Sequence, residues 1–487
     1  MIDRRQFLAV TAGAAGAGIT TGRAAIAKSP MGDMELVRAI LTTLHPGLYR
    51  YQSPKAVEQG IRKLERTWSS SPSRETRYLA LSAFLATIKC GHSYANFFNQ
   101  SVAVKKELFD RPTRLPFTFK WVGTQMVVLE SAAIDNRLPR GTIITSINDA
   151  PTATILRRLL PYVRADGSND GKRKALLSVT GADGLETFDV FHGLIFGTAK
   201  GSSTTQHRIA YRAPGTARDA RMDIPALSLA DRMARVPQKP KGDQPEWEWT
   251  MRDDGLAVLT MDGWGLYNSK WKWEPWLNDR LDSLKGARGL IVDIRENEGG
   301  LDCGDAILAR LSASDIVRPQ MRRLVRYDRV PGQLNPYLDT WDDSFRDWSD
   351  SVERYDDRFF IQKKSDDTSI IAQRGPRITV PMVVLTSAQN SSATFQFVQQ
   401  TRQSGLGRLI GETTGGNLRG INGGRFFFAR LPESGLEFDV PLVGTFPVAP
   451  MPDAGLRPDI AVSQTAADIA TGKDPALDRA VQYMKTL

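Results

Sequence analysis

The chain has 487 residues, of which 41% are hydrophobic and 24% are charged, and its formal net charge is +10. This length exceeds that of one ordinary domain and predicts about two to four domains, with ample apolar material for a core. Basic residues are scattered among acidic ones and form no dense run, which argues against a nucleic-acid partner. We therefore expect a soluble globular protein.

The N-terminus, residues 1–27, is typical of an export signal. The paired arginines Arg4 and Arg5 precede a weakly hydrophobic run rich in glycine and alanine, and Ala25-Ile26-Ala27 forms a small-x-small cleavage site. The segment resembles a twin-arginine signal. Its apolar run is too short to span a bilayer, and no later segment approaches that length. We expect cleavage after Ala27, a periplasmic or secreted protein, and no integral membrane segment.

Residues 28–112 carry apolar residues at three- and four-residue spacing, which predicts an N-terminal helical domain. Ser53 and Ser73 are placed to begin two of its helices. The last helix ends at His92 in the sequence KCGHSY, where Gly91 permits a sharp turn that exposes the imidazole ring. Structural roles are expected for the other three histidines, which are His45, His192 and His207.

Residues 113–235 change to the two-residue periodicity of β-strands. Their order of strands and turns, including the segment 141–148, resembles the PDZ-type modules of bacterial proteases, which take extended peptides by strand addition. Many other small β-domains share a similar order. A linker is predicted over residues 236–246, because its prolines and mixed charge prevent it from folding by itself.

Residues 247–487 alternate short apolar strands with helical stretches, which predicts an α/β core with crossover helices. An acidic and aromatic segment is inserted at about residues 335–358. Core packing of its aromatic stripe is favoured over a lid that covers substrate. Core packing is likewise favoured over the wall of a binding cleft for a cluster of four tryptophans, Trp264, Trp271, Trp273 and Trp276.

A strand-to-helix boundary is predicted within residues 383–400. Val383 to Thr386 form an apolar strand, a polar turn follows, and from Ser392 onward the apolar spacing is helical. A serine at this boundary exposes its hydroxyl beside the unpaired N–H groups of the first helical turn, which suits a nucleophile. The alternative is that Ser391 or Ser392 is only a helix N-cap, which is the commoner role for serine there.

A glycine pair, Gly299-Gly300, follows another predicted strand and the polar residues Arg295 and Asn297. Adjacent glycines let backbone N–H groups approach a ligand closely. Together with the N–H group of Ala393, this pair predicts an oxyanion hole. The alternative is a glycine turn that only opens the following helix.

Five motifs occur in the order GLIVDIRENEGG, VVLTSAQNSSATFQFV, IGETTGGNLRG, LPESGLEFDVPLVG and GLRPDIAV. This order resembles the catalytic core of the C-terminal processing and tricorn-type serine peptidases, and the helical and PDZ-like regions fit the N-terminal half of that family. The resemblance implies a crotonase-like ββα protease core. It also implies Ser392 as nucleophile, and Ala393 with Gly299 or Gly300 as donors to the oxyanion.

The general base differs between branches of the family that the sequence resembles. One branch uses a lysine after a Gly-x-x-Thr-x-Gly sequence, where this chain has Asn417. The tricorn-like branch uses a histidine at the end of the N-terminal helical region, and His92 in GHSY matches it. The resemblance therefore implies His92 as general base, since an imidazole accepts a serine proton at neutral pH.

A third catalytic residue is left open among Asp453, Asp459 and Glu412, and the Pro458-Asp459 pair also suits a structural role. A departure from the family is Phe395, where many relatives carry a glutamate that supports the nucleophile. The cysteines Cys90 and Cys303 lie close in sequence to His92 and to the glycine pair. If these motifs share one site the thiols are neighbours, so we hypothesise a Cys90–Cys303 disulfide, with two isolated buried thiols as the alternative.

The sequence thus favours an exported serine peptidase that cleaves a peptide or protein substrate through an acyl-enzyme. No cluster of histidines, cysteines and carboxylates has metal-ligand spacing, so neither a metal nor a cofactor is expected. Asn417 and Phe395 also fit a non-catalytic peptide- or lipid-binding protein, since the family resembled includes retinoid-binding relatives. A serine esterase would use the same nucleophile on another substrate.

Overall fold

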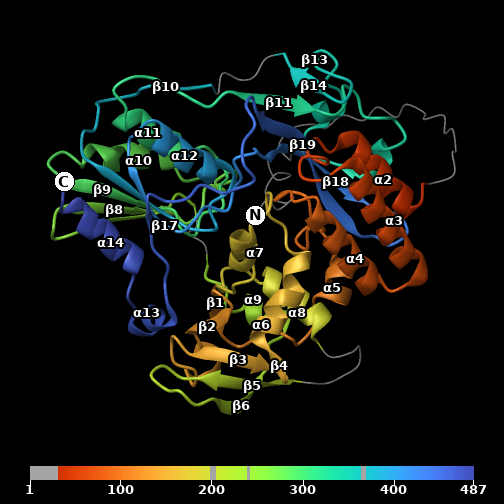
Figure 1. Ribbon diagram of the computed structural model, residues 1–487, viewed down its shortest axis with the longest axis horizontal. Coiled ribbons are helices and arrows are strands. Elements are labelled where there is room, and N and C mark those ends of the chain that lie inside the picture. Colours follow the sequence, from red (N-terminus) through yellow and green to blue (C-terminus); the bar gives the residue numbers. More distant parts are fainter. Residues whose placement is uncertain (1–30, 198–204, 239–241, 364–368) are drawn as a thin grey trace. The chain divides into compact units, whose positions relative to one another are not determined.

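The computed structural model describes residues 31–197, 205–238, 242–363 and 369–487 (Figure 1). The predicted export signal over residues 1–27 lies outside the described residues, as do residues 239–241 of the predicted linker. The chain divides into two compact units. The first unit consists of Met1–Val104, Arg322–Ser365 and Asn422–Phe446, and the second of Lys105–Met321, Asp366–Ile421 and Pro447–Leu487.

These units group the chain differently from the domains predicted at residues 28–112, 113–235 and 247–487. Arg322–Ser365 and Asn422–Phe446 come from the predicted core but belong to the unit of the N-terminal helices. The predicted boundaries follow the order of the sequence, whereas each compact unit is assembled from three separate segments. Periodicity along the chain identifies elements, but it does not show which elements share a core.

The first unit begins with helices, as predicted. Ser53 and Ser73 are the N-caps of two of them, and each hydroxyl oxygen accepts a backbone N–H group from the first helical turn. This capping satisfies donors that the helix itself leaves unpaired. The three helices are α2 (Asp33–Leu44), α3 (Pro54–Ser70) and α4 (Arg74–Thr87).

A six-stranded sheet in the order β12-β18-β19-β11-β14-β13 completes the first unit. The ring of Trp341 lies 6.0 Å from those of Phe426 and Phe428, and Trp348 stacks on Tyr327 at 5.1 Å. The inserted aromatic segment therefore packs in the core, as predicted, although it forms short strands and 3-10 turns rather than one helix. The strands are β11 (Met321–Val325), β12 (Leu338–Asp339), β13 (Val352–Arg354), β14 (Phe360–Gln362), β18 (Asn422–Arg430) and β19 (Glu437–Pro447).

The β-rich region of the second unit forms an antiparallel sheet in the order β1-β2-β3-β5-β6, with β4 paired to β3. Its core contains the ring of Phe119, which meets Phe188 edge to face at 4.9 Å. The PDZ-like assignment is compatible with this sheet and stays a prediction. The elements are β1 (Thr118–Val122), β2 (Gln125–Glu130), β3 (Ile143–Ile147), β4 (Ala150–Pro151), α6 (Thr152–Leu159), α7 (Asp170–Leu176), α8 (Thr187–Ile195), β5 (Gln206–Arg212) and β6 (Ala220–Pro225).

The α/β core of the second unit is built on a sheet in the order β20-β17-β16-β9-β8-β7. All neighbouring strands are parallel except β7, which pairs antiparallel with β8 at one edge. The strands and crossover helices predicted for this region are confirmed. They are β7 (Glu248–Met251), β8 (Leu256–Thr260), α10 (Trp273–Asp282), β9 (Gly289–Asp293), α11 (Gly304–Leu311), β16 (Met382–Thr386), α12 (Ser392–Gln403), β17 (Arg408–Gly411), β20 (Ile460–Ala461) and α14 (Pro475–Met484).

Both faces of this sheet are buried. Leu290 and Val292 of β9 pack with α10, α11 and α12, whereas Ile291 between them packs with α14 on the opposite face. Trp264 and Trp271 are buried in the first of these clusters, so core packing of the tryptophans is confirmed. Parallel pairing sets Leu385 of β16 beside Asp293 of β9, and the segments that follow these two strands therefore lie at the same edge.

Among the described residues, no helix is long and apolar enough to cross a membrane.

Candidate active site

The serine predicted as nucleophile lies at a strained strand-to-helix turn. Ser392 is the first residue of α12, is partly exposed, and has a φ of +53°. This left-handed conformation is uncommon for any residue but glycine and costs on the order of 1 kcal/mol. Ser391 occupies the N-cap position, but its side chain makes no cap bond; its hydroxyl instead donates to the Glu298 carbonyl at 3.1 Å. The N-cap alternative therefore does not explain this pair of serines.

A buried asparagine holds the turn that carries Ser392. The Asn390 side chain donates to the carbonyl oxygens of Ile294 at 2.5 Å and Asn297 at 3.1 Å, and it accepts the N–H group of Ser387 at 2.7 Å. It is fully buried. Sequence reasoning did not single it out, although its place in a polar turn directly after a buried strand was the available signal.

Gly299 of the glycine pair lies against the nucleophile turn, and Gly300 lies against Trp264. Gly299 and Gly300 have φ values of +111° and +139°, a region that glycine adopts without strain. The N–H group of Gly299 donates to the Asn297 side chain at 2.8 Å. In the described part of the chain, the N–H groups of Gly300 and Ala393 donate to no other group. Of the two predicted glycine donors, Gly300 is therefore the one available to an oxyanion.

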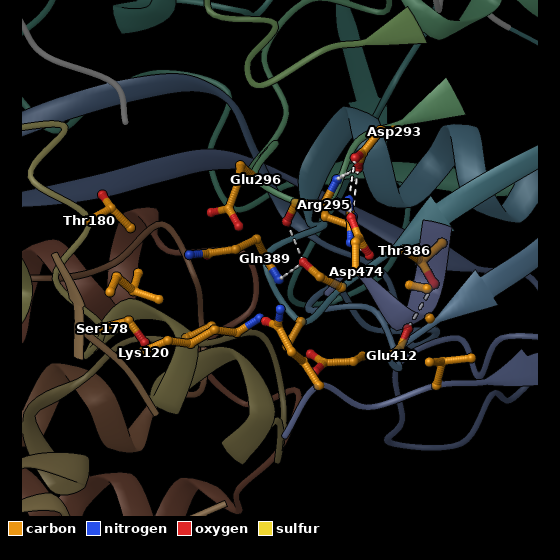
Figure 2. Close-up of a pocket in the computed structure, with 18 of the residues that line it drawn as sticks. Lys120, Ser178, Thr180, Asp293, Arg295, Glu296, Thr386, Gln389, Glu412 and Asp474 are labelled. Atoms are coloured by element: carbon orange, nitrogen blue, oxygen red, sulfur yellow. Dashed lines mark hydrogen bonds and ion pairs between the residues drawn. The ribbon is translucent and has the colours of Figure 1, made fainter. Parts of the chain in front are cut away.

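An arginine network stabilises the segment before the glycines. Arg295 donates to both carboxylate oxygens of Asp474, at 2.8 and 2.7 Å, and also pairs with Asp293 (Figure 2). Burial opposes the charge of Arg295, but the two carboxylates outweigh it and raise the pKa of the guanidinium. Arg295 is thus a structural anchor rather than a group free to bind substrate.

A cavity of about 280 Å³ lies beside the nucleophile turn in the second unit. Figure 2 shows side chains of both charges around it, including Lys120, Glu296 and Glu412. Gln389 lines the cavity, but Ser392 does not. The cavity is therefore separate from the predicted point of reaction.

An ion pair that sequence reasoning missed joins the glycine segment to the turn that carries Ser392. Lys172 on α7 pairs with Glu298, the residue before the glycines, and donates to the Gln389 carbonyl at 2.8 Å. The lysine and glutamate are separated by 126 positions. No local motif marks such a pair, so the sequence offered no signal for it.

His92 belongs to the first unit and has a partly exposed side chain. Its ring centre lies 5.8 Å from that of Phe426. The next residue, Ser93, is tied to His45 at 2.7 Å, while the Nδ1 atom of His45 accepts the N–H group of Gly47 at 3.1 Å. Burial lowers the pKa of His45 to about 3, so this imidazole is neutral and donates through Nε2. The predicted structural role of His45 is confirmed, and it holds the loop that carries His92.

The candidates for a third catalytic residue differ in their surroundings. Asp453 accepts the side-chain amide of Asn417 at 2.8 Å and the hydroxyl of Ser168 at 2.8 Å. Asp459 accepts the N–H group of Leu409 at 2.8 Å and pairs with Arg402. Both carboxylates thus join chain segments, which favours structural roles. Glu412 lines the cavity of Figure 2.

Three other positions discussed from the sequence, Cys90, Cys303 and Phe395, are buried. The hypothesised disulfide between Cys90 and Cys303 stays a prediction. Cys90 accepts the Asn422 amide at 3.4 Å, and burial raises the pKa of Cys303. Phe395 packs its ring against Gly416, so this position gives apolar packing where relatives were expected to carry a glutamate.

Part of the core matches a known family in comparisons with other proteins. Residues 255–436 match peptidase family S41. A structure of mature CPAF complexed with lactacystin has a TM-score of 0.62 at 14% identity, covering 93% of this chain and 97% of that chain. Another structure of mature CPAF has a TM-score of 0.58 at 14% identity, covering 93% of this chain and 95% of that chain. No curated protein matches the sequence. The predicted mixed α/β fold is confirmed.

Proposed function

We propose that the chain is a serine-type peptidase of family S41, the family that residues 255–436 match, that it is exported, and that it cleaves peptide bonds through an acyl-enzyme formed on Ser392. The observation that carries this proposal is the φ of +53° at Ser392, on a strand-to-helix turn packed against Gly299. Backbone strain of this kind persists where the surrounding structure enforces it, and it is concentrated at functional sites. A serine on such a turn presents its hydroxyl to a substrate.

In the proposed mechanism, the neutral imidazole of His92 accepts the hydroxyl proton of Ser392. At the same time the serine oxygen bonds to the carbonyl carbon of the substrate. The N–H groups of Ala393 and Gly300 stabilise the negative oxygen that forms. His92 then protonates the leaving amine, the C–N bond breaks, and an ester remains on Ser392. A water molecule that gives a proton to His92 hydrolyses this ester and restores the serine hydroxyl.

A fluorophosphonate probe tests the nucleophile. We expect the mature protein to be labelled and Ser392→Ala to remain unlabelled. Ser404→Ala, at the other end of α12, is the matched control and is expected to be labelled like the wild type. Equal labelling of Ser392→Ala would exclude Ser392. An unlabelled wild-type protein would favour a binding protein on this fold, and hydrolysis of esters without peptides would favour an esterase.

The pH dependence of labelling tests the base. A histidine base has to be neutral to accept a proton, so the labelling rate is expected to rise as the pH is raised from acidic values and then level off. His92→Gln is expected to label far more slowly and without this rise. A wild-type profile in His92→Gln would show that another group accepts the proton.

Export is tested at the N-terminus. The mature protein isolated from the periplasm or medium is expected to begin at Lys28, directly after the proposed cleavage site. Replacing Arg4 and Arg5 by lysine is expected to keep the precursor inside the cell. Export of the doubly substituted precursor at the normal rate would contradict a twin-arginine route.

A further inference from the structure

Lys172 is an almost completely buried cation on α7, with a side chain only 2% exposed. Its stem passes over Gly415, where an added Cβ would lie 2.9 Å from the lysine Cδ. Its ammonium group ends between Glu298 and Gln389. A buried lysine is rare unless it is paired, because removing its charge from water is costly. This position therefore requires the partners that it has.

The two partners of Lys172 lie on the two sides of the proposed oxyanion hole. Glu298 directly precedes the glycine pair, and Gln389 lies in the turn that leads to Ser392. The ammonium group pairs with the Glu298 carboxylate and donates to the Gln389 carbonyl at 2.8 Å and to its side-chain oxygen at 3.2 Å. A second bond, from the Ser391 hydroxyl to the Glu298 carbonyl, joins the same two segments.

Lys172 and its bonds to Glu298 and Gln389 are called the link from here on. The charges of Lys172 and Glu298 stabilise each other. Burial opposes ionisation of Glu298, but Lys172 and Arg164, the latter at 3.4 Å, outweigh it and hold the pKa of the carboxyl below its usual value. Burial also lowers the pKa of Lys172, and the charge of Glu298 opposes that shift. Three acceptors surround the three N–H donors of the ammonium group, which favours the protonated form. These contacts make Lys172 a paired group that joins two segments of the chain.

We propose that Lys172 is a positioning residue that holds the glycine pair against the nucleophile turn and so sets the spacing between the N–H groups of Gly300 and Ala393. This inference rests on the proposed function, because it assigns the link a role in stabilising the oxyanion. A displacement of about 1 Å in such a site is enough to slow a reaction by roughly 100-fold. The link comes from outside residues 255–436 and makes the site depend on the segment that carries α7.

The test compares Lys172→Met with Glu298→Gln and with a control, Arg232→Met. Arg232 is also a buried cation of the second unit, 4% exposed and paired with Asp189, but none of its contacts involves the nucleophile turn. We expect kcat to fall about 100-fold in both link variants with KM little changed. The control is expected to lose stability while its folded fraction keeps the wild-type kcat.

A double variant separates positioning from simple destabilisation. Lys172→Met with Glu298→Leu removes both charges, so stability is expected to recover relative to the single variants. The kcat is expected to stay low, because the bond to Gln389 is still absent. Recovery of kcat together with stability would overturn the proposal, and so would an equal loss of kcat in Arg232→Met.

Hydrogen exchange tests the link without any activity measurement. In folded Lys172→Met, the amides of residues 298–300 and 389–393 are expected to exchange faster than in the wild type, while those around Arg232 stay unchanged. Unchanged exchange in both segments would overturn the proposal even if the protein were active. Faster exchange in a protein that no serine probe labels would leave the link standing and refute the proposed function instead.

Discussion

Gly299 lies directly against Ser392: a Cβ added to the glycine would stand 2.8 Å from the Cβ of the serine. The same added atom would lie 3.0 Å from the backbone nitrogen of Ala393. Real Cβ atoms are not found this close to another Cβ, so any side chain at position 299 must displace the nucleophile turn. The φ of +111° at Gly299 adds a second, independent reason for glycine.

Gly299→Ala is expected to leave a folded protein with about 100-fold slower labelling by a serine probe, because the turn and the oxyanion donors move apart. Labelling rates measure the loss of reactivity, and thermal melting measures separately whether the protein stays folded. Gly263→Ala is the matched control, since no atom lies within 4 Å of its added Cβ. Normal labelling of Gly299→Ala would show that this close approach does not matter for reaction.

Ser392→Gly is expected to be more stable than Ser392→Ala, by about 1 kcal/mol, because glycine alone adopts a φ of +53° without strain. Urea unfolding of the two inactive variants measures the difference. At Gln399, in the interior of α12, the order is expected to reverse, since glycine is less favourable than alanine in a helix by about 1 kcal/mol. If alanine were also the more stable residue at position 392, Ser392 would not be strained.

Asn390→Ala is expected to lower the free energy of unfolding by about 3 kcal/mol, because it leaves buried groups of Ile294, Asn297 and Ser387 without a partner. Chemical denaturation measures the loss. Asn278→Ala, which removes one bond to Arg310 at 3.3 Å, is expected to cost less than about 1 kcal/mol. Equal losses at the two positions would contradict a special role for Asn390.

Glu186 is expected to make the protein less stable as the pH rises. Burial and the nearby charge of Asp189 raise the pKa of its carboxyl from 4.5 to about 7 in the folded protein. Between these two values the unfolded chain loses the proton while the folded protein retains it, so stability is full below about pH 4.5 and falls towards pH 7. The total effect is on the order of 3 kcal/mol.

Urea unfolding of the wild type and of Glu186→Gln at pH 4.5, 6 and 7.5 checks whether the free energy of unfolding falls as the pH rises. The variant is expected to lose the part of the pH slope that Glu186 contributes, whereas Glu130→Gln, an exposed position, is expected to keep it. A wild-type slope in Glu186→Gln would show that other groups cause the pH dependence.

The elements around the site were predictable because their signals are local. An apolar run followed by a polar turn and helical spacing identified both β16 and the start of α12, and the glycine pair marked the end of another buried strand. Parallel pairing of β9 with β16 then brings these two segments to one edge of the sheet. The assignment of Ser392 as nucleophile came from the order of several motifs. No single motif supports that assignment by itself.

The parts that could not be predicted depend on contacts between distant segments. Nothing near Ser392 in the sequence specifies a positive φ, which follows from how Asn390 and Gly299 pack around the turn. Lys172 and Glu298 have no shared motif. The disulfide between Cys90 and Cys303 stays a prediction, since it joins residues of two units that are each described by themselves.

The bond between Arg295 and Asp474 has a consequence for the order in which the segments of the site are anchored during synthesis. Asp474 is the N-cap of α14 and is synthesised after both the glycine pair and Ser392. While a ribosome is still making the chain, the arginine lacks this carboxylate and the segment it anchors is incompletely held. Full anchoring of the segment before the glycines therefore comes after synthesis of the turn that carries Ser392.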